Sequence, residues 1–134
     1  MLLMEGTRNN LAAAGMIKIK LTTDDIGKGF YIELNKSDVE EHVVKHWNPT
    51  VVKRATIDDI KVSMQDLDTN SEHEVNFRYY KHVGSYFLQG LWHRNFVDRR
   101  KLMAGDEIGI ACIPGSSHSL CFCVLKRSGG NNNK

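Results

Sequence analysis

The sequence predicts a mainly β domain, a seven-stranded open β-barrel capped by two short α-helices. Three observations favour this fold class. Apolar and polar residues alternate in many short stretches, as they do in strands with one buried face. Turns rich in Gly, Asn, Asp and Ser separate these stretches at short intervals. Only two segments have the apolar spacing of a helix, which is too few to cover both faces of a parallel sheet.

Length and charge restrict the class of protein. The chain has 134 residues, 41% of them hydrophobic, and this suits one domain that buries about two thirds of its unfolded surface. A net charge of +2 is far from the balance of proteins that coat nucleic acid indiscriminately, so nucleic-acid binding would need a shaped patch. The three cysteines follow no secretory leader, which indicates free thiols in a reducing compartment. No stretch has the length of a membrane span, so we expect no membrane contact.

The folded domain is predicted to span residues 16–127. The flanking segments, 1–15 and 128–134, lack hydrophobic periodicity and are expected to be flexible. No internal repeat is visible, so one domain accounts for the chain.

Alternation predicts strands at 17–21, 30–34, 57–65, 75–80, 86–88, 108–112 and 120–124. The first two strands are expected to pair as a hairpin around the polar loop 22–28. Residues 68–71 are expected to turn into a second hairpin, whose tip is the polar segment 81–85. A turn at 114–117 is expected to join the last two strands.

The first predicted helix spans residues 38–47. Ser37 and Glu40 have the spacing of a capping box, and the apolar residues that follow share one helical face. Asn48-Pro49 is expected to stop this helix.

The second predicted helix follows Trp92 and ends before the turn 104–106. Arg99, Arg100 and Lys101 are expected to be a solvated helix end that complements the helix dipole. Trp92 and Trp47 are expected to anchor the core.

Positive charge is concentrated between Arg78 and Lys101, where six Lys or Arg face one acid. Such segregation indicates a polyanionic partner. The hairpin tip in this stretch combines Lys81 and His82 with Gly84, which lets the backbone approach a partner closely. A two-stranded ribbon of this kind can enter the major groove of DNA.

Five stretches in this order resemble the plant-specific B-three DNA-binding domain, especially its reproductive-meristem and auxin-response-factor relatives: LTTDDIGKGFYIEL, SDVEEHVVKHW, FRYY, SYFLQGLW and FVDRRKLMAGDEIGI. The resemblance covers nearly all of residues 16–127. It implies a seven-stranded DNA-binding pseudobarrel with two capping helices. It also implies a nuclear plant transcription factor that grips double-stranded DNA with two loop arms and works with protein partners in transcription.

By this resemblance the first arm falls on residues 22–28 and the second on residues 80–85. The residues expected to contact DNA are Thr22, Thr23, Lys28, Tyr80, Lys81, His82, Gly84 and Ser85. The lysines would hold phosphates, which supply most of the affinity. Thr23, His82 and Ser85 are the candidates for reading base edges.

Two features depart from the family pattern. Gly29-Phe30 stands where relatives usually place an arginine, and Asn35 stands where they usually place proline. The missing arginine removes a bidentate reader of guanine or phosphate. This leaves open an alternative function: a B-three-like protein-interaction module with weak or no sequence-specific DNA binding.

Cys121 and Cys123 are candidate metal ligands, with Cys112 and His118 nearby in the sequence. Structural zinc usually draws on CxxC turns, whereas CxC in an alternating strand is typical of core packing. We therefore expect no metal.

Catalytic motifs find little support. His42 and His46 lie one helical turn apart, but the glutamate of a zinc hydrolase motif is missing. Because the chain has no Gly-rich phosphate loop and no nucleophile elbow, we expect neither an enzyme nor a cofactor.

Overall fold

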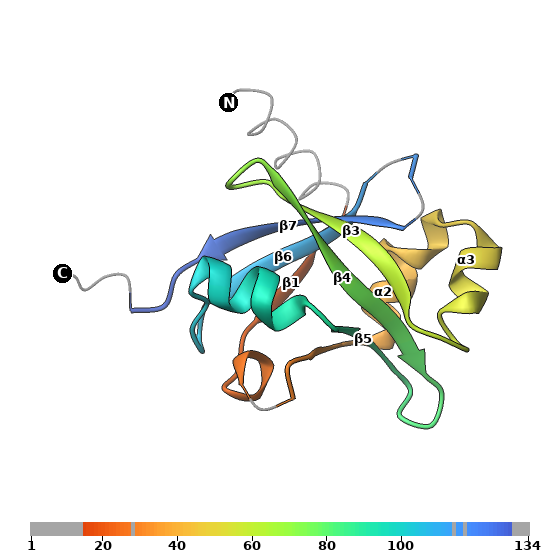
Figure 1. Ribbon diagram of the computed structural model, residues 1–134, viewed down its shortest axis with the longest axis horizontal. Helices are drawn as coiled ribbons and strands as arrows, with labels where there is room; N and C mark the ends of the chain where they lie inside the picture. The colour runs from red at the N-terminus through yellow and green to blue at the C-terminus, as the bar shows by residue number, and fades with distance from the viewer. Residues whose placement is uncertain (1–14, 28, 114, 117, 130–134) are drawn as a thin grey trace.

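The computed structural model describes residues 15–27, 29–113, 115–116 and 118–129, which fold into one curled sheet with helices at its two ends (Figure 1). Seven strands follow the order β1-β6-β7-β3-β4-β5-β2. Their bounds are β1 (Ile17–Lys20), β2 (Ile32–Leu34), β3 (Ile60–Asp66), β4 (Ser71–Tyr80), β5 (Ser85–Gln89), β6 (Glu107–Cys112) and β7 (Ser119–Lys126). Because β1 and β2 form the two edges, the barrel stays open, and the predicted fold class is confirmed.

Strand pairing is antiparallel except between β3 and β7, which run parallel. The predicted hairpin of the first two strands is wrong, because β1 pairs with β6 and β2 pairs with β5. The loop between β1 and β2 therefore connects the two edges of the sheet, across the open side of the barrel. The second predicted hairpin is confirmed: β4 pairs with β5, and Tyr80 lies opposite Ser85.

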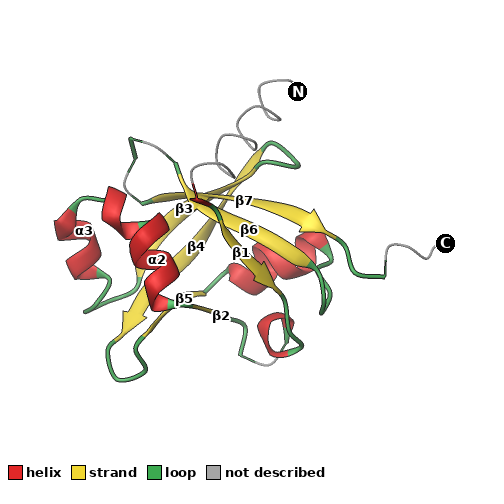
Figure 2. Ribbon diagram, turned by 180° about the vertical axis from the view of Figure 1, so that it is seen from behind, coloured by secondary structure: helices red, strands yellow, loops and turns green. Residues whose placement is uncertain are grey.

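The helical segments are more numerous than the two that the sequence predicts. They are η1 (Asp24–Ile26), α2 (Lys36–His42), η2 (Val44–His46), α3 (Pro49–Arg54) and η3 (His93–Asp98), which is wound as a π-helix. Figure 2 shows α2 and α3 at one end of the sheet and the η3 segment at the other. None of the described helices is long and apolar enough to cross a bilayer.

Two caps explain where the first helices begin. Asn35 caps α2 by accepting a hydrogen bond from the backbone of Asp38 (3.1 Å). The helical stretch of α2 and η2 stops at Trp47, which is extended, as the Asn48-Pro49 pair predicts. The sequence did not predict the further helix α3, which Asn48 caps by accepting a hydrogen bond from the backbone of Thr50 (2.8 Å). Pro49 takes its first helical position, where the missing N–H is not needed.

The core lies inside the curl of the sheet. Trp92 and Phe96 stack there at 5.7 Å between ring centroids, and Phe122 meets Phe96 at 4.8 Å. Trp47 contacts Phe77 from the end that α2 covers (5.1 Å). Both tryptophans are buried, which confirms that they anchor the core.

The outer face of β6 and β7 carries a second, smaller apolar cluster. Cys121 and Cys123 are buried in it with Met16, Leu67 and Ala111. Cys112 belongs to the main core instead, and none of the three cysteines, all within the described residues, forms a disulfide. Burial raises the pKa of Cys121 to about 12. The expectation that the CxC pair fills a core is therefore confirmed.

The sequence predicts that the folded domain begins at residue 16 and ends at residue 127. The backbone N–H of Ser128 donates to Asp106 (2.7 Å), and its hydroxyl donates to the carbonyl of Ala104 (3.0 Å). The fold thus includes Ser128. The expectations for residues 1–14 and 130–134, and part of the turn at 114–117, lie outside the described residues.

Candidate nucleic-acid interface

Two loops leave the sheet at the same edge of the molecule. The first arm, residues 22–28, contains η1, and the second arm, residues 80–85, contains the β4–β5 turn; the described residues of both arms lie at the lower edge in Figures 1 and 2. The arms are separate in sequence but adjoin the same strand pair, because β2 follows the first arm and β5 follows the second. Lys28, a predicted phosphate contact, lies outside the described residues.

Hydrogen bonds within the first arm fix its start. The backbone N–H of Thr22 donates to the carboxylate of Asp25 (2.8 Å), and the backbone N–H of Asp25 donates to the Thr22 hydroxyl (3.3 Å). This reciprocal pair is a capping box that spans one short turn. Thr23 precedes η1 without capping it, so its exposed hydroxyl is available to a partner.

The first arm is held to the core by two ring N–H groups from the η3 end of the barrel. Trp92 Nε1 donates to the carbonyl of Asp25 (3.3 Å), and His93 Nε2 donates to the carbonyl of Ile26 (3.0 Å). Phe30, just after the arm, packs its ring edge-on against His93 at 4.8 Å. The sequence did not reveal these contacts, since 67 residues separate each donor from its acceptor.

Phe30 itself has an uncommon conformation. Its φ is 58° and its side chain is 58% exposed. A bulky residue in the left-handed region is strained, and such strain is concentrated at functional sites. The resemblance drawn from the sequence implies an arginine near this position, and the structure has an exposed aromatic ring there.

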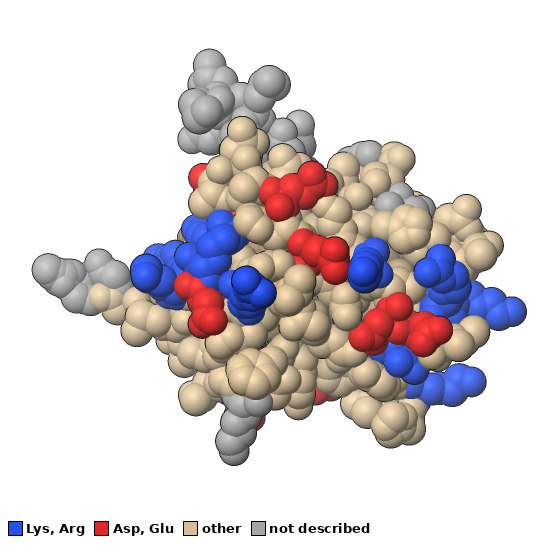
Figure 3. Space-filling view, viewed as in Figure 1, with Lys and Arg blue, Asp and Glu red and all other residues tan. Residues whose placement is uncertain are grey.

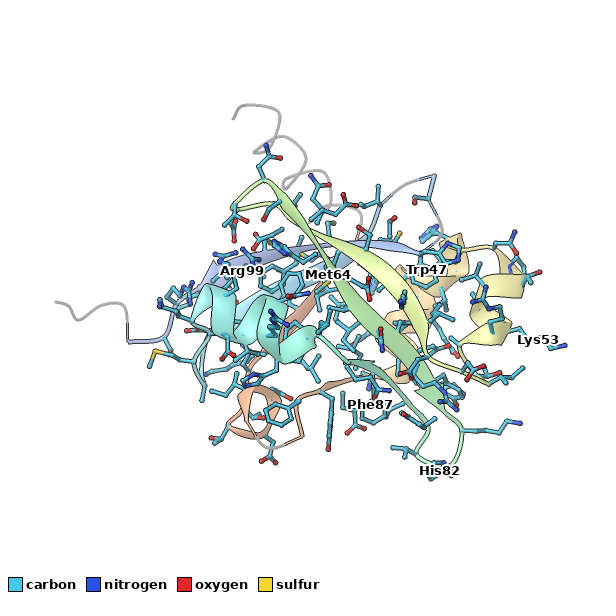
Figure 4. The ribbon with its side chains drawn as sticks, in the orientation of Figure 1. Trp47, Lys53, Met64, His82, Phe87 and Arg99 are labelled. Carbon is cyan, nitrogen blue, oxygen red and sulfur yellow. The ribbon has the colours of Figure 1, made fainter. Side chains whose placement is uncertain are left out.

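The second arm is a tight turn. The N–H groups of Val83 and Gly84 both donate to the carbonyl of Tyr80 (3.0 and 2.8 Å). Gly84 has a φ of 79°, and a Cβ at this position would meet nothing within 4 Å, so the backbone angle rather than space requires glycine. Lys81 and His82 are exposed at the tip, and Figure 4 shows His82 pointing away from the barrel.

Two predicted contacts of the second arm are engaged within the protein. The Tyr80 hydroxyl accepts a hydrogen bond from Gln89 (2.9 Å), and its ring lies under the guanidinium of Arg78 (4.7 Å). The Ser85 hydroxyl donates to the carboxylate of Glu33 (2.6 Å). Both residues are half-buried, so they shape the base of the arm more than its tip.

The six cations between Arg78 and Lys101 do not form one patch. Arg99 and Arg100 each lie 2.6 Å from the buried carboxylate of Asp66, so the expectation that they are a solvated helix end is wrong. Figure 3 shows Lys and Arg mostly in two groups, at the end of the sheet near η3 and at the end near α3.

Two cations at the α3 end of the sheet were not singled out from the sequence, because helix α3 itself was not predicted. Lys53 and Arg54 end this helix, and both are exposed. The helix is joined to β4 by the N–H of Tyr79, which donates to the carbonyl of Ala55 (2.9 Å). Figure 4 shows Lys53 pointing outward from α3. Helix α3 therefore adds two exposed cations at the end of the sheet where Tyr79 leads into the second arm.

The structure gives no support to the metal alternatives. Cys112 lies in the main core, whereas Cys121 and Cys123 lie in the second cluster. Within the ranges that the structure describes, no group of three or more His, Cys, Asp or Glu side chains is placed to hold a metal ion.

Comparisons with known proteins agree with this geometry. The family described as B3 domain-containing protein At5g26805, C-terminal domain, matches residues 16–125. A putative B3 domain-containing protein of Arabidopsis thaliana, At1g78640, is 37% identical over 97 residues, which are 70% of this chain and 20% of that relative. The chain thus spans about a fifth of the length of this relative (20%).

Solved structures share the fold. The Arabidopsis FUS3–DNA complex matches with a TM-score of 0.59 and 21% identity over 84% of this chain and 97% of that one. The complex of the Arabidopsis thaliana transcription factor LEC2 with DNA matches with a TM-score of 0.52 and 19% identity over 87% and 92% of the two chains. At these identities the likeness concerns the fold alone. The family match, which covers most of the chain, establishes that this protein belongs to the B3 domain family.

Proposed function

We propose that this chain is the double-stranded DNA-binding domain of a nuclear plant transcription regulator, and that it grips the major groove with its two arms without catalysis. The observation that carries the proposal is the placement of the arms. Both lie at the same edge of the molecule, and each presents exposed polar or cationic side chains. The DNA complexes of FUS3 and LEC2, which share this fold, support it.

In this proposal the second arm is the element that enters the major groove. A two-stranded ribbon such as β4–β5 fits the major groove, and the small Gly84 lets the turn approach base edges. His82, exposed at the tip, would meet base edges, and Lys81 would bind a phosphate as a point charge. Tyr80 and Ser85 support the arm from its base.

The first arm supplies the opposite contact. Thr23 offers an exposed hydroxyl and Lys28 a cation to the strand on the other side of the groove. Because Trp92 and His93 fix the arm's carbonyls, the arm loses little conformational entropy on binding. Its sequence preference would come from few side chains, since the usual arginine is absent.

Phosphate contacts would dominate the affinity. Lys81, Lys28 and the α3 pair Lys53 and Arg54 are the side chains expected to release counterions from the duplex. The local charge beside the arms, rather than the net charge of +2, therefore determines binding.

The test is a selection from random duplexes followed by a binding titration at several salt concentrations. We expect an enriched motif and an affinity that falls steeply as salt rises. Salt-insensitive binding, or no binding at low salt, would contradict the proposal and favour the protein-interaction module.

A further inference from the structure

Glu33 of β2 presents an outward-facing carboxylate beside the second arm. Ile32 and Leu34 of β2 point into the core (0% and 2% exposed), so the alternate residues Tyr31 and Glu33 face outward. The Glu33 carboxylate accepts a hydrogen bond from the hydroxyl of Ser85, the last residue of the second arm (2.6 Å). Glu33 is therefore bonded to the second arm, and along the chain it follows the first arm by five residues.

Aromatic contacts hold the part of the sheet that carries this carboxylate. Glu33 lies opposite Phe87 in the β2–β5 register, and the Phe87 ring meets that of Tyr31 edge-on at 5.3 Å. Phe87 also meets the Tyr80 ring at 5.3 Å. The backbone around Glu33 is thus held by packing, and its exposed side chain is held by the hydrogen bond from Ser85.

The charge of Glu33 opposes the proposed function unless it has a specific use. Within the described part of the chain, Ser85 donates to Glu33, and no Lys or Arg side chain forms an ion pair with it. A carboxylate that faces phosphates weakens binding to every duplex, whatever its sequence. A carboxylate has acceptor positions on two oxygens, so the hydroxyl of Ser85 leaves capacity for a further donor.

We propose that Glu33 accepts a hydrogen bond from the N4 amino group of a cytosine in the major groove and so selects cytosine at one position of the target. This inference rests on the proposed function. In the major groove cytosine presents a donor, whereas guanine and thymine present acceptors that repel a carboxylate. Adenine carries its donor beside the N7 acceptor, which makes it a poorer partner. The residue thus exchanges general affinity for base preference.

The experiment compares wild type, Glu33→Ala and Glu74→Ala in the same random-duplex selection, followed by titrations with duplexes that differ at the selected cytosine. We expect the wild type to prefer cytosine there by about fivefold or more. Glu33→Ala should lose this preference and bind the other duplexes as tightly as the wild type or more tightly. Glu74→Ala, the matched control, removes an exposed carboxylate of β4 that lies outside both arms, so it should retain the preference.

The contrary results are distinct. If Glu33→Ala keeps every base preference and binds all duplexes more weakly, the carboxylate only supports the hairpin, and the inference is wrong. If Glu33→Ala and Glu74→Ala lose the preference equally, the general loss of negative charge is responsible, and the inference is also wrong. If the wild type binds no duplex, the proposed function fails, and the inference with it. Circular dichroism melting of each variant verifies that it is folded.

Discussion

Arg100 places one guanidinium nitrogen, Nη1, 2.8 and 2.6 Å from the two carboxylate oxygens of Asp66, whose side chain is fully buried. Arg99 adds a contact of 2.6 Å to the same carboxylate. Asp66 ends β3, and both arginines follow η3, so the cluster joins the β3–β4 turn to the segment that anchors the first arm. The densest run of positive charge in the sequence is therefore largely structural.

Replacing Asp66 by Ala should lower the free energy of unfolding by about 3–5 kcal/mol, because removing one partner of a buried ion pair leaves the other charges uncompensated. Urea unfolding measures the loss. The control is Glu41→Ala, which removes the exposed pair of Glu41 with Lys45 and should change the unfolding free energy little. Equal effects of the two substitutions would show that the Asp66 cluster does not stabilise the fold.

Asp106 gives a prediction about pH. Burial raises the pKa of its carboxyl, but backbone hydrogen bonds from Ser128 and Met103 and the charge of Arg127 outweigh this, so the pKa lies below its ordinary value of 3.8. Since the folded state lowers this pKa, the stabilisation is present above pH 3.8 and is lost as the pH falls through the lower folded value.

The variant Asp106→Asn tests this linkage. Its unfolding free energy should differ from that of the wild type by a constant amount above about pH 5, and the difference should shrink between about pH 4 and pH 3. Urea unfolding at a series of pH values measures it. A difference that stays the same across this range would mean that the ionised form is not the one that stabilises the fold.

His93 should position the first arm. In His93→Ala the carbonyl of Ile26 loses its donor, so amide hydrogen exchange of residues 24–27 should become faster, and the unfolding free energy should fall by about 1 kcal/mol. Duplex affinity should weaken with it. His46→Ala, at an exposed position on η2, serves as the control. Unchanged exchange in the arm would contradict the anchoring role.

Alternation sufficed to predict strands because each strand has one face in the main core. It did not predict their partners: β1 pairs with β6, far along the chain, since the order of strands in a sheet is a non-local property. Helix α3 was missed for a different reason. The same dipeptide can end one helix and begin another, and Asn48-Pro49 does both here, because the side chain of Asn48 caps α3.

At the site too, local structure could be predicted from the sequence, whereas partners distant in the sequence could not. Lys81 and His82 were predicted at an exposed tip, and the structure places them there, because a hairpin is a local structure. The partners of Ser85, Arg99 and Arg100 lie more than thirty residues away, at separations of 52, 33 and 34. Whether a cation is free or paired therefore could not be deduced from the charge pattern.

Lys81 should contribute one phosphate contact. In Lys81→Ala, the slope of log affinity against log salt concentration should flatten by about 0.9, the value for one released counterion. Fluorescence anisotropy with the selected duplex measures it. Lys18→Ala is the matched control, because Lys18 is exposed on β1, the sheet edge opposite β2. The same flattening in both variants would show that the protein's overall charge, not the second arm, holds the duplex.

The most direct measurement is an NMR titration of the protein with a short mixed-sequence duplex at low salt. Two arms that straddle one groove predict backbone shifts confined to residues 22–29 and 80–86, while the amides of β6 and β7 stay unchanged. Shifts centred on β6 and β7, or no shifts at all, would contradict the account.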